Sequence, residues 1–506
     1  MSEMRRESGV GSRARLLLLL LGAAACGGTP VVVATQAPAP ASTESVTAVS
    51  PALVQPPAVG EPRPLTLPPI IRRELANGLE LLIVEHHELP VANFLLLVKS
   101  GYEDDPAGAP GLVSLTAAML DEGAGRRSAL AISSQQATLG ASLGTGAGYD
   151  AVTIALQTPT AQLDSALALF ADVALRPTFP QEELDRLRAE RLTLLTQLKD
   201  RGPGIADVAY PAVLYGSGHP YGRPTLGTEQ SVRAVTRDDL VRFYTSHFRP
   251  NDATLIIVGD VDPDAITRRI ETLFGGWQRG AVPSSSVAAA RQPAARAVYL
   301  IDKPGAAQSS VRIGTIGVAR ATPDYFPVLV MNTVLGVPFG SRLNQNLRES
   351  KGYTYGARSQ FDMREHAGPF TARAEIVREK TDSALVEFMK ELTRIRDTVP
   401  QDELLRAKRY LQTQLPGDFE TPSDIANRLV PIALYGLPLD FYNSYSQRVE
   451  AVTQAEVQRA AQQHIDPSRL AILVVGDRAQ IESGIRALGL GEVHIRDITG
   501  GPVVAP

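Results

Sequence analysis

Residues 236–260 read TRDDLVRFYTSHFRPNDATLIIVGD, and residues 453–477 read TQAEVQRAAQQHIDPSRLAILVVGD. At this offset of 217, seven of the 25 positions are identical, and the run before Gly-Asp is apolar in both copies. A second pair, PQEEL from Pro180 and PQDEL from Pro400, lies at an offset of 220. A motif that recurs at a long, nearly fixed spacing indicates a duplicated structural unit. The sequence therefore predicts one unit of about 200 residues that occurs twice.

Each copy opens with two apolar stretches that predict β-strands, at 79–84 and 91–98 in the first copy and at 298–301 and 311–316 in the second. Helical spacing of apolar residues follows in each copy, at 182–198 and at 402–415. Strands mixed with amphipathic helices favour an α+β fold. We expect two homologous α+β repeats.

The first residues have the pattern of an export signal. Four arginines precede an apolar run over 16–21, small residues follow, and Cys26 comes directly after them. This pattern predicts a lipoprotein-type signal peptide over 1–25 with Cys26 as the lipid attachment point. The usual lipobox has Leu three positions before the cysteine, whereas this chain has Ala23, and ordinary cleavage that leaves Cys26 unmodified is the alternative. We expect an exported, lipid-anchored protein of the bacterial cell envelope that faces the periplasm.

The remaining boundaries follow from composition. A stretch rich in Pro, Ala and Thr predicts a tether over 26–66, and a second Ala/Ser/Pro-rich stretch predicts a linker over 279–295. The two repeats are then expected at 67–278 and 296–498, with a tail at 499–506.

Composition excludes some classes of function. The chain has 506 residues, 50 Lys and Arg against 54 Asp and Glu, and one cysteine. This balance gives no electrostatic reason to expect a nucleic-acid partner. A single cysteine forms neither an internal disulfide nor a multi-thiolate metal site.

Several motifs, in this order along the chain, resemble those of a known family. They are NGLELLIVEHHELP from Asn77, GLVSLTAAMLDEGAG from Gly111, FPQEELDRLRAER from Phe179, GHPYGRPTLGT from Gly218, IIVGDVD from Ile256 and FGSRLNQNLRESKGYTYGARS from Phe339 to Ser359. Together they make residues 68–498 similar to the pitrilysin/insulinase family of zinc peptidases, in its short bacterial and mitochondrial-processing form. The resemblance implies the fold of that family, in which each repeat is an antiparallel or mixed sheet covered by helices and the two repeats form a clam-like pair.

Family members that cut peptides carry H-x-x-E-H on the first long helix, where positions i, i+3 and i+4 share one face. The histidines bind zinc and the glutamate activates its water, with a third ligand from a later helix. In this sequence Ser114 and Ala118 stand at the histidine positions, Ala117 at the glutamate position and Gln197 at the third ligand. We expect no zinc site in this chain, and a small-residue helix face that packs closely instead.

The other histidines offer no replacement site. The seven are His86, His87, His219, His247, His366, His464 and His494, and none forms an H-x-x-x-H pair. His86 and His87 lie in a predicted solvated turn, and His247 and His464 are repeat equivalents, which favours a shared packing role. A Ser-His-Asp triad is not excluded by the sequence.

The second copy retains a further part of the family's site. The resemblance implies that an arginine and a tyrosine seven residues apart hold the substrate and stabilise charge on the attacked carbonyl. Arg348 and Tyr355 match these positions. Both side chains are competent donors to an oxyanion. The alternative is structural, with Arg348 paired to a nearby carboxylate and Tyr355 a half-buried strand residue.

The resemblance therefore implies the zinc-less chain of a heteromeric peptidase. Such a chain would bind no cofactor itself, would pair with a homologous zinc-bearing subunit, and would bind peptides or unfolded protein in the shared chamber while supplying Arg348 and Tyr355. Two alternatives stay open: a peptide-binding or scaffold protein of the cell envelope without proteolysis, and a metallopeptidase active on its own.

Overall fold

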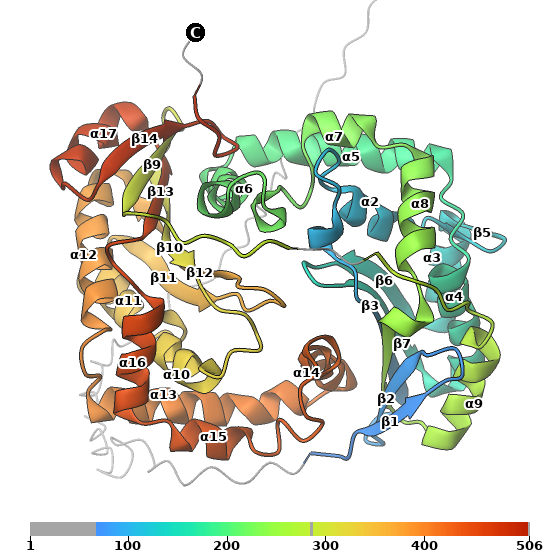
Figure 1. The fold of residues 1–506 in the computed structure, drawn as a ribbon. Coiled ribbons are helices and arrows are strands. Elements are labelled where there is room, and N and C mark those ends of the chain that lie inside the picture. Colours follow the sequence, from blue (N-terminus) through green and yellow to red (C-terminus); the bar gives the residue numbers. More distant parts are fainter. Residues whose placement is uncertain (1–66, 284–286, 504–506) are drawn as a thin grey trace, which may run out of the picture. The chain divides into compact units, whose positions relative to one another are not determined.

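The computed structural model describes residues 67–283 and 287–503. The predicted signal peptide, Cys26 and the whole of the predicted tether lie outside these residues. Two six-stranded mixed sheets organise the described chain, one in each sequence copy (Figure 1). The predicted α+β duplication is confirmed. No helix within the described residues is long and apolar enough to cross a membrane.

The first sheet, here the N-terminal sheet, has the strand order β1-β2-β8-β3-β7-β6. Its strands β2 and β8 are parallel, and its other pairs are antiparallel. The strands are β1 (Ile71–Glu74), β2 (Glu80–Glu85), β3 (Val91–Val98), β6 (Ser142–Ala147), β7 (Val152–Pro159) and β8 (Ala253–Gly259). A two-stranded hairpin, β4 (Gly123–Ala124) and β5 (Arg127–Ser128), lies outside this sheet.

The second sheet, here the C-terminal sheet, has the strand order β11-β12-β10-β13-β9-β14. Its five strands other than β14 repeat the N-terminal arrangement, but its last edge strand comes from the end of the chain and is parallel to β9. The strands are β9 (Ala297–Asp302), β10 (Gln308–Ile316), β11 (Thr354–Phe361), β12 (Pro369–Val377), β13 (Ala471–Gly476) and β14 (Glu492–Arg496).

Helices surround both sheets. In the first copy they are α2 (Leu112–Met119), α3 (Ala129–Leu139), α4 (Leu163–Leu175), α5 (Gln181–Lys199), α6 (Gly202–Tyr215), α7 (Glu229–Ala234), α8 (Arg237–His247) and α9 (Pro263–Phe274). In the second they are α10 (Tyr325–Gly336), α11 (Arg342–Asn344), α12 (Thr381–Arg394), α13 (Gln401–Gln414), α14 (Pro422–Tyr435), α15 (Tyr445–Ala451), α16 (Gln454–His464) and α17 (Arg478–Ala487).

The residues shared by the two copies have identifiable structural roles. Thr236 and Thr453 are the N-caps of α8 and α16, and each forms a capping box with the acidic residue three positions on. Gly259 ends β8 at φ +146°, where a Cβ would lie 2.3 Å from the Val91 carbonyl oxygen. The repeated motif therefore fixes a helix start and a close approach of neighbouring strands.

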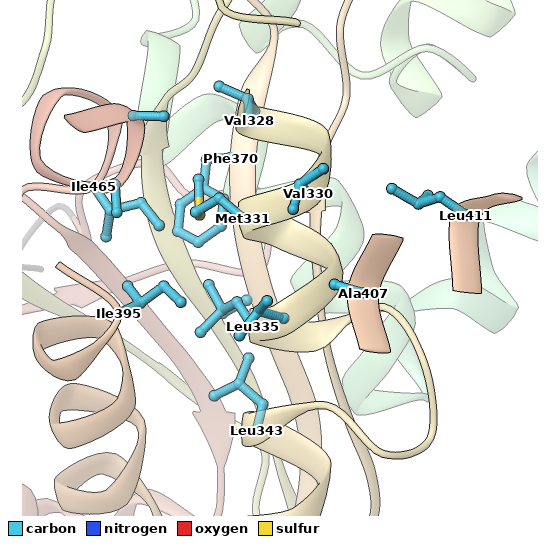
Figure 2. Close-up of a cluster of buried hydrophobic side chains, with 14 of the residues drawn as sticks. Val328, Val330, Met331, Leu335, Leu343, Phe370, Ile395, Ala407, Leu411 and Ile465 are labelled. Atoms are coloured by element: carbon cyan, nitrogen blue, oxygen red, sulfur yellow. The ribbon is translucent and has the colours of Figure 1, made fainter. Parts of the chain in front are cut away.

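Helix α10 is the centre of the C-terminal core. Its sequence YFPVLVMNTVLG is apolar on nearly every side, which is typical of a helix buried on all faces. It packs against β11, α13 and α16. Figure 2 shows Met331 beside Phe370 of the sheet, and Val330 on the side of the helix that faces Ala407 and Leu411 of α13.

Each sheet is also covered by a helix from the other sequence copy (Figure 1). Helix α6 packs on β10 and β13 of the C-terminal sheet, and α14 packs on β3 and β8 of the N-terminal sheet. The two helices are themselves repeats, since PAVLYG from Pro211 and PIALYG from Pro431 lie at an offset of 220. We refer to the covered surfaces as the α6 face and the α14 face.

Candidate functional site

The N-terminus of α2 is held by a buried carboxylate. Asp105 accepts hydrogen bonds from the Gly111 amide at 2.7 Å and the Val113 amide at 2.8 Å. Burial raises the pKa of Asp105 to about 7, although these amides oppose the shift. Gly111 has φ +87°, and a Cβ there would lie 2.6 Å from the Gly227 nitrogen. The start of α2 is thereby fixed against the segment before α7.

The positions that would hold zinc lie on α2 and are occupied by small side chains. Ser114 and Ala117 are buried, and Ala118 is half-buried. The Ser114 hydroxyl accepts a hydrogen bond from Arg191 Nη1 of α5 at 3.0 Å. The same nitrogen donates to the Leu226 carbonyl at 3.3 Å. A guanidinium therefore lies against this face of α2.

Arg191 is a partly desolvated cation. Burial lowers its pKa, and the neighbouring Tyr102 and Asp105 act in the opposite direction. An arginine side chain remains protonated in proteins at ordinary pH, so a positive charge stays at this position.

These residues do not fit a zinc ion. Zinc takes thiolate, imidazole or carboxylate ligands, whereas Ser114, Ala117 and Ala118 offer one hydroxyl and two methyl groups. The Arg191 cation beside Ser114 would also repel a metal ion. Across 67–283 and 287–503, no group of three or more His, Cys, Asp or Glu side chains could hold a metal.

The structure places Gln197 on an exposed part of α5. It follows Arg191 by six residues, which corresponds to a rotation of about 240° around the helix axis. The nearby Glu190 forms an ion pair with Arg186 at 2.8 Å. The structure thus brings Ser114 together with Arg191, and leaves Gln197 on another side of α5.

Arg348 lies in a π-helical turn, Gln345–Ser350, directly after α11. Such turns are rare and frequently occur at functional sites. The Arg348 guanidinium carbon lies 4.6 Å from the centre of the Phe339 ring, and Phe339 is itself exposed. Arg348 Nε is 3.2 Å from Glu349 Oε1. The cation is held in place at the surface and remains partly accessible to solvent.

Tyr355 is the most exposed large hydrophobic residue of the described chain, at 87%. It lies on β11, where the pairing with β12 shifts between Thr354 and Ala357. Both of these flanking residues are buried, so the bulge turns Tyr355 to the α6 face, opposite Glu375. Bulges re-aim side chains in this way beside functional sites. The structural alternative requires a half-buried Tyr355, and the exposed side chain contradicts that part of it. The ion pair between Arg348 and Glu349 agrees with its other part.

One serine motif escaped the sequence analysis. Residues 140–144 read GASLG, which matches the G-x-S-x-G pattern of a nucleophile elbow. That elbow requires a strand before the serine and a helix after it. Here α3 ends at Leu139 and β6 begins at Ser142, so the order is reversed. The motif gives no support to a Ser-His-Asp triad.

The two repeat-equivalent histidines end equivalent helices, α8 and α16, but differ in their contacts. His247 Nδ1 lies 3.1 Å from the Phe243 carbonyl, and its ring stacks on Phe243. His464 Nε2 lies 2.9 Å from Asp324 Oδ2. Both contacts tie a helix end to its surroundings, and neither involves a residue of α2.

Comparison with known proteins gives two family matches. Residues 81–201 match the model described as insulinase, peptidase family M16, and residues 234–411 match the model described as peptidase M16 inactive domain. The first range contains α2 and α5, and the second contains Arg348 and Tyr355.

Relatives of similar length carry two kinds of description. An uncharacterized zinc protease of Rickettsia bellii is 24% identical over 68% of this chain and 82% of its own. The non-peptidase homolog YmxG of Helicobacter pylori is 23% identical over 78% of this chain and 91% of its own. A solved structure of a peptidase M16 inactive domain from Pseudomonas fluorescens is 27% identical, with a TM-score of 0.76, over 80% of this chain and 97% of that one.

Proposed function

Since the chain belongs to the insulinase family of peptidases, family M16, we propose that it is a non-catalytic member which pairs with a zinc-bearing homologue. In this proposal it helps to form the peptide-binding chamber, and Arg348 and Tyr355 contribute to the partner's reaction. It binds no zinc itself, and the zinc belongs to the partner subunit.

One contrast carries the proposal. On α2 the ligand positions are filled by small side chains, and Ser114 is bonded to a cation. In the second copy, the tyrosine at the family's substrate-binding position is almost fully exposed, and its arginine partner lies in a π-helical turn at the surface. A phenol that neither packs in a core nor has a hydrogen-bond partner within the described chain is available to a substrate. The description of one relative as a non-peptidase homolog agrees with this reading.

The chemistry available to the two side chains is specific. A guanidinium and a phenolic O–H both donate hydrogen bonds to an oxygen that gains negative charge. Neither needs to exchange a proton with the substrate for this role. The stacking of Arg348 on Phe339 restricts the guanidinium, so less freedom is lost when it binds a carbonyl oxygen.

The test uses the full chain and a homologue from the same genome that carries an intact H-x-x-E-H motif. We expect the chain alone to hold no stoichiometric zinc and to cleave no peptide. The mixture of the two chains should bind zinc and cleave peptides. Tyr355→Phe and Arg348→Gln should each lower kcat of the pair about 10- to 100-fold, since removal of one oxyanion donor has effects of this order or larger.

Matched controls are available on α13. Tyr410→Phe and Arg409→Gln remove the same groups outside the proposed site and should leave kcat unchanged. Assembly of the pair, measured by gel filtration, should be unchanged in all four variants. Unchanged turnover in both site variants would remove Arg348 and Tyr355 from the reaction, and tight zinc binding with cleavage by the chain alone would refute the proposal.

The scaffold alternative keeps the fold and lacks the catalytic partnership. It predicts that no H-x-x-E-H homologue copurifies with the chain, and that the Tyr355 and Arg348 variants have no effect on any peptidase activity. Copurification of the tagged chain, followed by identification of its partners, separates the two readings.

We further propose that the protein is exported and attached to the membrane through Cys26. The support is the sequence pattern of residues 1–26 alone. Mass spectrometry of the mature N-terminus should find a lipidated cysteine, and Cys26→Ser should abolish it. An unmodified cysteine in the mature protein would contradict the anchor.

A further inference from the structure

Helix α6 covers only part of the C-terminal sheet. It packs on β10 and β13, whereas the outer strands β12 and β11 have exposed side chains on the same face. Tyr355, Arg358 and Gln360 of β11, and Arg373 of β12, belong to this open strip. The strip therefore continues directly from the proposed position of Tyr355.

The register of the strands aligns three arginines across this face. Arg358 of β11 is directly opposite Arg373 of β12, and Arg373 is directly opposite Arg312 of β10. Directly paired residues of neighbouring antiparallel strands point to the same face, with Cβ atoms about 5 Å apart. The three positive charges thus form one row perpendicular to the strands.

The three arginines differ in whether a carboxylate of the chain pairs with them. Arg312 is buried by α6 and bonds two carboxylates, with Nη2 at 3.0 Å from Asp207 and Nη1 at 3.0 Å from Glu375. Arg358 and Arg373 are exposed, and no carboxylate of the described chain lies within ion-pair distance of either. Like charges that face each other across two strands are unfavourable unless a counter-charge is supplied.

The first sequence copy provides an internal comparison. Ile256 and Leu473 are equivalent in the repeat, and they pair with Leu95 and Arg312 respectively. Continuing outward, Leu95 pairs with Ala155 and Ala155 with Gly144. The row Gly144-Ala155-Leu95 thus corresponds to Arg358-Arg373-Arg312.

The fold itself therefore does not require charge at these positions, because the same architecture is built with small and apolar residues in the N-terminal sheet. The buried Arg312 is explained by Asp207 of α6 and Glu375. Arg358 and Arg373 have no such intramolecular explanation within the described residues.

A small cavity lies beside the row. It has a volume of about 170 Å³, and its lining includes Arg373 and Arg312 together with Gln360, Thr371 and the carboxylates Asp207 and Asp362. Polar side chains thus surround the inner end of the open strip. Strand β11 is an edge strand of its sheet, and the backbone of an edge strand can pair with an extended peptide.

We propose that the Arg358–Arg373 pair binds a carboxylate side chain of an extended acidic peptide that lies along β11. This inference rests on the proposed peptide-binding function and specifies its substrate class. A guanidinium binds a carboxylate through two parallel hydrogen bonds, and two guanidinium groups at this spacing can share one carboxylate or bind two. Tyr355 lies on the same face of the same strand, so the bound peptide would pass it.

The test measures binding of labelled twelve-residue peptides to the full chain by fluorescence anisotropy. One peptide contains several Glu and Asp residues, its twin has Gln and Asn in their place, and a third carries Lys. At low salt we expect the acidic peptide to bind at least 10-fold more tightly than its amide twin. The difference should shrink as ionic strength rises, because salt screens exposed charges.

The double variant Arg358→Gln/Arg373→Gln should lose this difference, and the control Arg268→Gln on α9, an exposed arginine without an ion pair in the described chain, should retain it. The charge reversal Arg358→Glu/Arg373→Glu should prefer the Lys peptide, which tests the site even if affinity falls. Circular dichroism melts verify that each variant folds.

Each outcome is decisive. Equal binding of the acidic and amide peptides, or an unchanged preference in the double variant, would overturn the carboxylate site while leaving peptide binding intact. Absence of binding by all three peptides would instead contradict the peptide-binding function on which the inference rests. Competition by inorganic phosphate at equal ionic strength, with no preference for acidic peptide, would identify a general anion site and also refute the proposal.

Discussion

At the scale of single residues, the most informative contact is the one between Arg191 and Ser114. Ser114 stands where the family resemblance implies a metal ligand, and it contacts a cation supplied by the chain itself. Loss of the ligands alone would remove the attraction for a metal ion, whereas the guanidinium beside Ser114 adds a charge that repels one. The same region also carries buried carboxyl groups at the start of α2 and in the turn Tyr102–Asp104.

One of these carboxyl groups predicts a measurable pH dependence. Burial raises the pKa of Glu103 to about 8, and the neighbouring Asp150 and Asp104 carboxylates add to the shift. In the unfolded chain a glutamate loses its proton near pH 4.5. Between these values the folded state binds more protons, so the contribution of Glu103 to stability falls as pH rises from about 4.5 to about 8.

We therefore expect Glu103→Gln to be more stable than the unchanged chain at pH 8.5, and similar to it at pH 4. The glutamine can still accept the hydrogen bond from the Tyr221 hydroxyl, which lies 3.3 Å from the carboxylate. After allowance for solvent screening, the gain at high pH should be roughly 1–2 kcal/mol. Urea unfolding at both pH values measures it, with the exposed Glu88→Gln as control. Parallel pH profiles for all three proteins would contradict the prediction.

At the scale of elements, the exchange of α6 and α14 explains features that neither repeat shows alone. The α14 face of the N-terminal sheet is apolar, with Leu82, Leu95 and Ile256 buried in the same cluster as Leu429 of α14. The α6 face buries Leu473 and Val475 in the same cluster as Ile205 and Ala209 of α6. Each helix thus covers an apolar surface on the sheet of the other copy.

A substitution on α14 tests the strength of this packing. Leu429 is 1% exposed, and Leu429→Ala should lower the free energy of unfolding by about 2–5 kcal/mol, through lost burial and the cavity that remains. Leu405→Ala on α13, where the side chain is 39% exposed, should cost less than about 1 kcal/mol. Denaturant midpoints of the two variants measure the contrast. Equal effects would show that α14 does not anchor the N-terminal sheet.

At the scale of the whole described chain, the exchange makes the two copies dependent on each other. A copy produced alone would expose the sheet face that the other copy's helix covers, and large exposed apolar patches promote association. The ion pair between Asp207 of α6 and Arg312 of β10 would also be lost, because the two residues belong to different copies.

The expected behaviour of the separate copies follows. Residues 1–283 and 287–506 should each be largely insoluble when expressed alone, and they should recover solubility and copurify when expressed together. The intact chain should unfold in one calorimetric transition, because neither core is complete without the other copy. Two separate transitions, or two soluble monomeric fragments, would contradict this dependence.

The sequence by itself determined the duplication, the principal strands and helices, and the absence of metal ligands at 114, 117 and 118. These features are local, because each can be recognised from a short stretch of sequence. They depend on strand alternation, helical periodicity, capping residues and the identity of the ligands. Helices expected at 182–198 and 402–415 agree with α5 and α13 within one residue at each end. The missed GASLG motif could also have been evaluated from the sequence, because only the order of the predicted helix and strand around Ser142 is needed.

Only the tertiary structure decided which distant residues meet. Arg191 is 77 residues from Ser114, and neither residue predicts the other. Arg358, Arg373 and Arg312 come from three strands, and a shift of one residue in the register would send one of them to the opposite face. The bulge that exposes Tyr355 and the exchange of α6 and α14 likewise depend on strand pairing and core packing, which are cooperative properties of the folded chain.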